Sequence, residues 1–174
     1  MPVSVFCGVS VDGFLARRDG SLDFLDAGGA EPHGYEEFIA TVDTVVWGRN
    51  TYDFVRPFKS WPYPPKMRVV VLSHRPLEEP ASGWKIEHMS GEPTEIIGKL
   101  AATGANHLYV DGGKTIQEFL RAGLVDRMIV TRVPVLIGEG IPLFGSLPQD
   151  VKLKHIGTRE YAGGLVQTEY EVVR

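Results

Sequence analysis

A direct passage from strand to helix at residues 107–123 constrains the fold more than any other feature of the chain. The run 107–110 predicts a buried strand, and apolar residues recur at helical spacing over 114–122. Only Asp111-Gly112-Gly113 separates them, and glycines tolerate positive φ angles and a close approach by another group. The first amides of a helix lack internal partners and attract anions. The junction therefore predicts an α/β fold, with either a simple tight turn or an anion site.

Similar alternation continues through most of the sequence. Strands are expected at 3–11, 44–47, 68–72, 84–88, 107–111 and 126–137, and helices at 35–41, 50–55, 93–102 and 114–122. Such alternation favours parallel strands with helices on both faces. Two alternating runs at 152–161 and 165–173, joined by residues 162–164, predict a final antiparallel hairpin. Residues 1–174 are therefore expected to form one domain around a mixed, mostly parallel sheet.

Three further segments lack this regularity. Residues 21–34 are polar and contain glycines, which predicts a loop. Residues 56–66 combine four prolines with three aromatic residues, which predicts an irregular segment that packs against the domain or covers a site. Pro134 within the run 126–137 predicts an edge strand or a bulge. The apolar character of that run and of 138–144 suggests a homodimer interface.

Composition excludes several classes of function. Hydrophobic residues make up 43% of the chain and the formal net charge is -4, with no dense Lys and Arg cluster, so a nucleic-acid partner is not expected. No apolar run is long enough to span a bilayer. The single cysteine, Cys7, fits a cytoplasmic location. The five histidines show no metal-ligand spacing, so no metal site is predicted.

A second junction repeats the pattern of the first. Trp47-Gly48-Arg49-Asn50-Thr51 also runs from strand to helix, and a third strand ends in Ser73-His74-Arg75. Ligands of open α/β sheets bind beyond the carboxyl ends of the strands. Two junctions could hold a pyrophosphate, and guanidinium groups there suit a further phosphate such as the 2′-phosphate of NADPH. Taken singly, each feature is better explained by an ordinary turn or a solvated charge, whereas the three together favour a binding site.

Four stretches carry a resemblance to a known family. They are VSVDGFLA (9–16), VVWGRNTY (45–52), VVVLSHRP (69–76) and the long block 108–144 that begins LYVDGGKT. In this order they resemble the dihydrofolate reductase-like superfamily, and most closely its riboflavin-biosynthesis reductase branch, the RibD C-terminal domain. The resemblance implies a three-layer α/β/α fold with an eight-stranded, mostly parallel sheet and NADPH bound across the strand ends.

The same resemblance implies a set of cofactor residues. A loop from Ser10 to Ala16 would cover the nicotinamide, and Phe6, Val9, Trp47 and Val110 would line the sheet side. The implied cofactor-binding residues are Ser10, Gly13, Ala16, Gly48, Arg49, Thr51, Ser73, His74, Arg75, Asp111, Gly112, Gly113, Lys114 and Thr115.

The implied activity is NADPH-dependent reduction of a small planar heterocycle. Glu36 and His33 are the candidate catalytic residues, although the carboxylate that dihydrofolate reductases place on the first helix has no convincing counterpart, which argues against folate. Trp61, Tyr63 and Phe58 could stack on the substrate or only pack their loop. Two alternatives stay open, a riboflavin-pathway reductase with a phosphorylated ribosylamino-pyrimidine substrate and a nucleotide-binding protein without catalysis.

Overall fold

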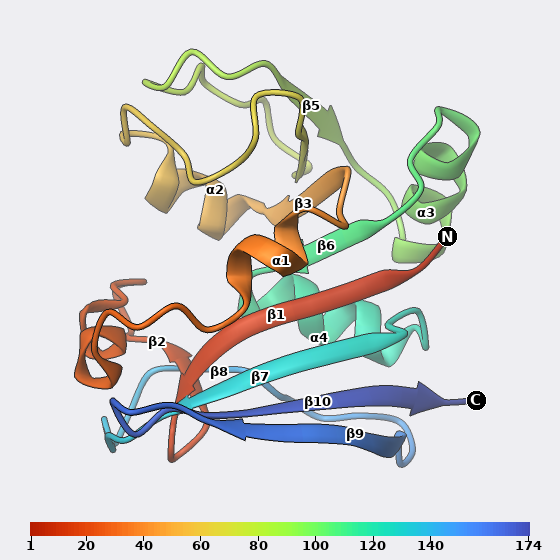
Figure 1. The fold of residues 1–174 in the computed structure, drawn as a ribbon. Helices are drawn as coiled ribbons and strands as arrows, with labels where there is room; N and C mark the ends of the chain where they lie inside the picture. Colours follow the sequence, from red (N-terminus) through yellow and green to blue (C-terminus); the bar gives the residue numbers. More distant parts are fainter.

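The expected strands form one eight-stranded sheet in a computed structural model that describes residues 1–174 (Figure 1). Its order is β5-β4-β3-β6-β1-β7-β10-β9, and every neighbouring pair up to β7 is parallel, whereas β10 is antiparallel to β7 and β9. The strands are β1 (Val3–Ser10), β3 (Thr44–Gly48), β4 (Arg68–Leu72), β5 (Ile86–Met89), β6 (Leu108–Asp111), β7 (Arg127–Val133), β9 (Lys152–Glu160) and β10 (Val166–Val173). The mixed, mostly parallel sheet is confirmed.

Helices cover both faces of this sheet, which gives three layers (Figure 1). The helices are α1 (Tyr35–Ile39), α2 (Arg49–Val55), α3 (Pro93–Ala102) and α4 (Gly113–Arg121). One core packs α3 and α4 through Ile96 and Phe119 against strand residues such as Val5. The other packs α1 and α2 through Phe38 and Tyr52. Burial of these apolar faces holds the helices on the sheet.

The carboxyl ends of the central strands are aligned, and this alignment determines where the candidate site lies. In the parallel register Trp47 of β3 lies opposite Asp111 of β6, and Gly48 lies opposite Leu72 of β4. Helices α2 and α4 begin directly after β3 and β6. The two strand-to-helix junctions recognised in the sequence are therefore neighbours at the carboxyl edge of the sheet.

Two expectations about local structure are wrong, and one small sheet was not anticipated. The strand expected at 126–137 stops at Val133, and it lies inside the sheet between β1 and β10 rather than at an edge. Pro134 simply follows the strand, where its missing N–H costs no ladder hydrogen bond. The loop expected at 21–34 contains a 3₁₀ helix, Asp23–Gly28. A separate two-stranded sheet of β2 (Phe14–Ala16) and β8 (Ile141–Pro142) was not anticipated.

The C-terminal hairpin is confirmed, and it leaves β9 as an edge strand. All but one residue of β9 are exposed, including Leu153 and Ile156, and Val173 of β10 is exposed beside them. None of the helices has the length and apolar character required to cross a membrane.

Candidate cofactor and substrate site

The two strand-to-helix junctions fit into each other through glycine and threonine. A Cβ built on Gly48 would lie 2.5 Å from the Oγ1 atom of Thr115, at the start of α4. A Cβ on Gly112 would collide with the Oγ1 atom of Thr51, at the start of α2, and Gly112 also has a φ of 97°. Both positions therefore need glycine because a Cβ would come too close to the facing threonine. Gly112 needs it also because of its positive φ angle.

A polar cavity of about 300 Å³ opens beside these junctions. It contains only one hydrophobic residue among its 14 lining residues, and basic and hydroxyl side chains dominate the rest. The structure brings together here most of the residues that the sequence assigns to cofactor phosphates, namely Gly48, Arg49, Thr51, Ser73, His74, Arg75, Lys114 and Thr115. This donor set suits anionic oxygens.

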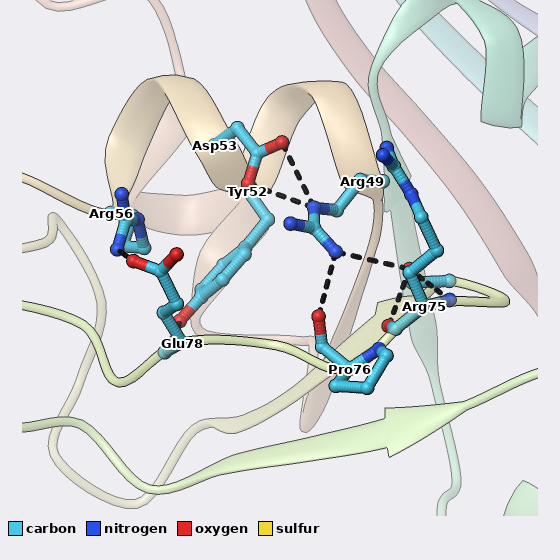
Figure 2. Close-up of polar contacts among 8 residues, drawn as sticks. Arg49, Tyr52, Asp53, Arg56, Arg75, Pro76 and Glu78 are labelled. Carbon is cyan, nitrogen blue, oxygen red and sulfur yellow. Dashed lines mark hydrogen bonds and ion pairs between the residues drawn. The ribbon is translucent and has the colours of Figure 1, made fainter.

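Arg49 ties α2 to the segment that follows β4 (Figure 2). Its Nε donates to both carboxylate oxygens of Asp53 at 2.9 Å, and its Nη1 donates to the carbonyl of Pro76 at 2.9 Å. Tyr52 and Arg56 strengthen the same link, because both donate to Glu78. Much of the Arg49 guanidinium is therefore engaged within the protein, which leaves fewer donors for a phosphate than the sequence alone suggests.

Arg75 is in a different situation. Its guanidinium makes no ion pair and extends away from the Arg49 contacts (Figure 2), and both Arg75 and the neighbouring His74 are exposed. Ser73, in contrast, is buried, and its Oγ donates to the Arg75 carbonyl at 2.9 Å and accepts from the Arg75 amide at 3.1 Å. Ser73 therefore shapes the turn, and Arg75 and His74 present their side chains to the cavity.

Helix α4 contributes its N-terminal end. No side chain caps it, so the amides of its first turn remain available, and exposed Lys114 stands at its second position. Asp111 accepts a hydrogen bond from the Gly112 amide at 2.8 Å. This contact holds the carboxylate back on the strand side of the turn, so Asp111 does not oppose an anion at the helix end.

A second cavity, of about 1020 Å³, lies against the first. Asn50 and Thr51 line both cavities, so the first turn of α2 forms their common wall. The larger cavity is mostly apolar and aromatic. Its aromatic lining residues are Phe6, Tyr35, Trp47, Phe54, Phe58, Trp61, Tyr63 and Tyr109. The proline-rich segment 57–63 thus borders this cavity, and it lies within the segment 56–66 that was expected either to pack against the domain or to cover a site.

The aromatic residues of this segment also pack on one another. Trp61 is buried, donates its indole N–H to the Val55 carbonyl at 3.1 Å, and meets the ring of Trp47 at 5.0 Å between centroids. Trp84 stacks on the far side of Trp61. Both roles considered from the sequence, packing and lining of a pocket, therefore apply to Trp61.

Three carboxyl groups line the large cavity, those of Asp19, Asp53 and Asp111, and Asp111 is the one that is not exposed. Burial raises its pKa to about 6, and the hydrogen bond from Gly112 only partly opposes that shift. Burial and the nearby Asp111 raise the pKa of Tyr35 to about 12, and they also raise those of Tyr63, Tyr109 and the Cys7 thiol. The tyrosines and the thiol are therefore neutral, and Asp111 can hold or release a proton near neutral pH.

Two of the four expected sheet-side residues do not reach the cavity. Phe6 and Trp47 line it, but Val9 and Val110 belong to the core under α3 and α4, on the opposite face of the sheet. Successive side chains on a strand point to opposite faces, so Trp47 and Val110, on strands in register one position apart, cannot share a face. Tyr109 and Asp111 take their place in the wall.

The segment 10–16, expected as a loop over the nicotinamide, forms a tight turn that leads into strand β2. Ala16 lines the large cavity, but Ser10 is fully buried and its Oγ accepts the Phe14 amide at 3.0 Å. Exposed Gly13 has a φ of 87° and closes the turn by donating its amide to the Ser10 carbonyl. Asp12 accepts the Gly138 amide at 2.8 Å. Ser10 and Gly13 therefore shape this segment from outside the two cavities.

Neither candidate catalytic residue lies in the large cavity. Glu36 is an exposed residue of α1, and the His33 ring packs near Phe6 and Tyr161. Sequence reasoning placed Asp111 with the cofactor and missed its position in the large cavity. The sequence did not reveal it, because the position depends on the register of β6 against β3, in which Asp111 lies opposite Trp47 and on the same face of the sheet.

The chain matches the RibD C-terminal domain over residues 2–167. It belongs to this family. Members of the family are NAD(P)-dependent reductases that use NADPH. The uncharacterized protein YwjB of Bacillus subtilis is 33% identical over 172 residues, which cover 95% of each chain.

Two solved structures show how this family member relates to others in three dimensions. A putative riboflavin biosynthesis protein from Shewanella sp. PV-4 is 38% identical and superposes with a TM-score of 0.90 over 100% of both chains. Dihydrofolate reductase from Enterococcus faecalis, solved with NADP(H), is 16% identical and has a TM-score of 0.67 over 99% of this chain and 97% of its own. The RibD C-terminal domain described here therefore has the dihydrofolate reductase-like fold.

Proposed function

We propose that this protein is an NADPH-dependent reductase that acts on a small planar heterocycle. The observation that carries the proposal is the pair of adjoining cavities, one polar and basic, the other aromatic, with Asn50 and Thr51 in the wall of both. An extended dinucleotide has the same division, because its phosphates need donors and its reactive ring needs an apolar, orienting surface. When bound, NADPH supplies the hydride.

The polar cavity would hold the phosphates. Lys114 and the first-turn amides of α4 suit the pyrophosphate, and Arg75 with His74 suits the 2′-phosphate. The basic, hydroxyl-rich lining fits the group chemically, and Arg75 is the side chain with an unpaired guanidinium there. Arg49 contributes mainly by holding the wall that carries Arg75 in position.

The large cavity would hold the ring that is reduced. Its aromatic walls orient a flat molecule and exclude water, which favours transfer between closely held rings. Hydride transfer to a C=N or C=O bond also requires a proton. Asp111, with a pKa raised to about 6, is the group in the wall that can supply it near neutral pH.

Cofactor titration tests this proposal. We expect NADPH to quench tryptophan fluorescence, and NADH to bind about tenfold to a hundredfold more weakly, because only NADPH carries the 2′-phosphate. Arg75→Ala should remove most of that preference while leaving NADH binding unchanged. Arg121→Ala, at the exposed C-terminal end of α4, is the matched control and should change neither. Absence of binding by both nucleotides would overturn the proposal.

The riboflavin-pathway alternative is supported by the match to the RibD C-terminal domain and by the description of the Shewanella protein as a putative riboflavin biosynthesis protein. It predicts that the best substrate is a phosphorylated ribosylamino-pyrimidine. The non-catalytic alternative predicts tight NADPH binding with no NADPH oxidation over a broad panel of heterocycles. Turnover measured on that panel separates all three.

A further inference from the structure

Helix α1 reaches the large cavity through one residue, Tyr35. The helix begins at Tyr35, directly after Gly34, which has a φ of 84°. Tyr35 is half-buried and lines the cavity, whereas the next residues, Glu36 and Glu37, are exposed and do not line it. The Tyr35 ring meets the Phe6 ring edge-on, with 5.5 Å between the centroids. This packing holds the ring and so defines the place of its hydroxyl in the cavity wall.

The Tyr35 hydroxyl is the outer end of a chain of three polar groups. Its neighbour is the hydroxyl of Tyr63, which belongs to the proline-rich segment and also lines the large cavity. Tyr63 in turn contacts the indole N–H of Trp47, in a contact too loose to satisfy that buried N–H by strict geometry. The rings of Tyr63 and Trp47 pack together, with 5.7 Å between their centroids. The chain therefore links β3 to α1 across the cavity wall.

The chemistry of these three groups sets the direction of donation. An indole N–H can only donate, whereas a hydroxyl has one proton and two acceptor positions. Trp47 therefore donates to Tyr63, and Tyr63 donates to Tyr35. The pKa of Tyr63 agrees with this order: burial and the Asp111 charge raise it most, the contact with Trp47 lowers it, and the hydrogen bond with Tyr35 raises it further.

The proton of Tyr35 is left without an acceptor in the protein. Burial and then the Asp111 charge raise the pKa of Tyr35 to about 12, so the proton stays on at neutral pH. Tyr63 is the one hydrogen-bond partner of the hydroxyl and lowers this pKa, which is the effect of a donor. Asp111 acts through its charge and not through a hydrogen bond. The cavity thus presents a neutral hydroxyl, with a proton available to a ligand, near its buried carboxyl group.

We propose, on the basis of the proposed function, that Tyr35 binds the substrate, and that its hydroxyl donates to a carbonyl oxygen at the edge of the heterocycle. Tyr35 is then a specificity-determining residue that favours an oxo-substituted ring over the same ring with amino groups. An amino group brings protons to a place where the hydroxyl already offers one, and it leaves the Tyr35 proton unpaired within the site.

The test compares two matched probes, lumazine (2,4-dioxopteridine) and 2,4-diaminopteridine, which carry oxo or amino groups at the same carbons of one ring system. Each is titrated by calorimetry at pH 7 into protein saturated with NADP⁺. We expect the wild type to bind lumazine about tenfold more tightly than the diamino compound, the effect of one hydrogen bond. Tyr35→Phe should abolish most of this preference by weakening lumazine. It keeps the ring that packs on Phe6, so the variant should fold.

Two further variants locate the contact. Tyr63→Phe should reduce the preference less than Tyr35→Phe does, because Tyr63 acts on the ligand only through Tyr35. Tyr170→Phe, the same change on β10 outside both cavities, should have no effect.

Four results would each overturn the inference: no binding of lumazine, tighter binding of the diamino compound by the wild type, an unchanged preference in Tyr35→Phe, or a larger loss in Tyr63→Phe than in Tyr35→Phe. NADPH affinity, measured separately in the wild type, reports on the proposed function alone. Normal NADPH binding with any of these four results would therefore remove the role of Tyr35 and leave the reductase proposal standing.

Discussion

Gly112 and Thr51 lie so close that the Oγ1 atom of Thr51 occupies the position a Cβ on Gly112 would need. The contact joins the turn after β6 to the first turn of α2, and Gly48 and Thr115 make the reciprocal contact. Each junction thus fixes the position of the other. Both cavities border these turns, so this pair of contacts helps to determine their shape.

We therefore expect Gly112→Ala to lower the free energy of unfolding by about 2 kcal/mol, because alanine would be strained at a φ of 97° and would displace Thr51. Urea denaturation monitored by circular dichroism measures this. Gly98→Ala in α3 is the control, since its Cβ meets nothing within 4 Å, and helix propensity should make it neutral or stabilising by up to about 1 kcal/mol. Equal effects of the two substitutions would contradict the account.

Asp111 predicts a pH dependence of stability. Its folded pKa, about 6, lies above the ordinary value of 3.8, so the native state binds the proton more tightly than the unfolded state. The contribution of Asp111 to the free energy of unfolding is therefore fully favourable below pH 4 and is lost as the pH rises through 6. Asp111→Asn removes this loss. We expect the unfolding free energy of the variant relative to the wild type to rise by roughly 2–3 kcal/mol between pH 4 and 7.

Asp111 also predicts a pH dependence of activity. If it donates the proton, turnover falls above about pH 6 as the carboxyl group ionises, and Asp111→Asn lowers turnover at all pH values with little effect on NADPH affinity. Steady-state rates across pH 5–9 measure this. A turnover profile that is the same in the variant and the wild type would assign the proton to water.

The thiol of Cys7 provides a probe of the large cavity. Burial and the neighbouring Asp111 raise its pKa, and the side chain is 6% exposed. We expect iodoacetamide at pH 7.5 to alkylate the native protein at least about a hundredfold more slowly than the urea-unfolded chain, because the thiolate is the reactive form. Mass spectrometry follows the reaction. Rapid alkylation of the native state would indicate a more open cavity.

Homodimerisation remains a prediction, although its expected surface changes. Strand β7 is interior, whereas Leu153 and Ile156 are 41% and 43% exposed on the edge strand β9. We expect Ile156→Lys to weaken a dimer seen by sedimentation equilibrium, since apolar side chains on an open edge favour association. Phe144→Lys, in the region suggested by the sequence, is the comparison. If only Phe144→Lys dissociated the dimer, the interface would lie in the region that the sequence suggested. A monomeric wild-type protein would exclude both interfaces.

The sequence predicted the parallel part of the fold well because β-branched strands and helical spacing are local signals. The two junctions were found for the same reason, since glycine in a strand-to-helix turn is visible in a few residues. Non-local properties were less accessible. The place of β7 inside the sheet depends on β10, which follows more than 30 residues later, and the short pairing of β2 with β8 leaves no periodic pattern.

The same distinction explains the site. Residues such as Arg75 and Lys114 were recognised because they sit within the junction motifs. The exchange of Val9 and Val110 for Tyr109 and Asp111 in the large cavity depended on which face of the sheet each residue occupies. Likewise, the hydrogen bond from Arg49 to the Pro76 carbonyl could be known only once the segment after β4 was placed beside α2.

The position of the segment 57–63 in the wall of the large cavity has a consequence for how members of this family can differ in their substrates. Trp61 anchors the segment to α2 by one hydrogen bond, and most of the segment lies outside the sheet and helices that hold the polar cavity. Substitutions within 57–63 can therefore reshape the aromatic chamber while the phosphate-side architecture stays intact. Related chains could in this way inherit a shared electron source and evolve different substrates by changing a single stretch of about seven residues.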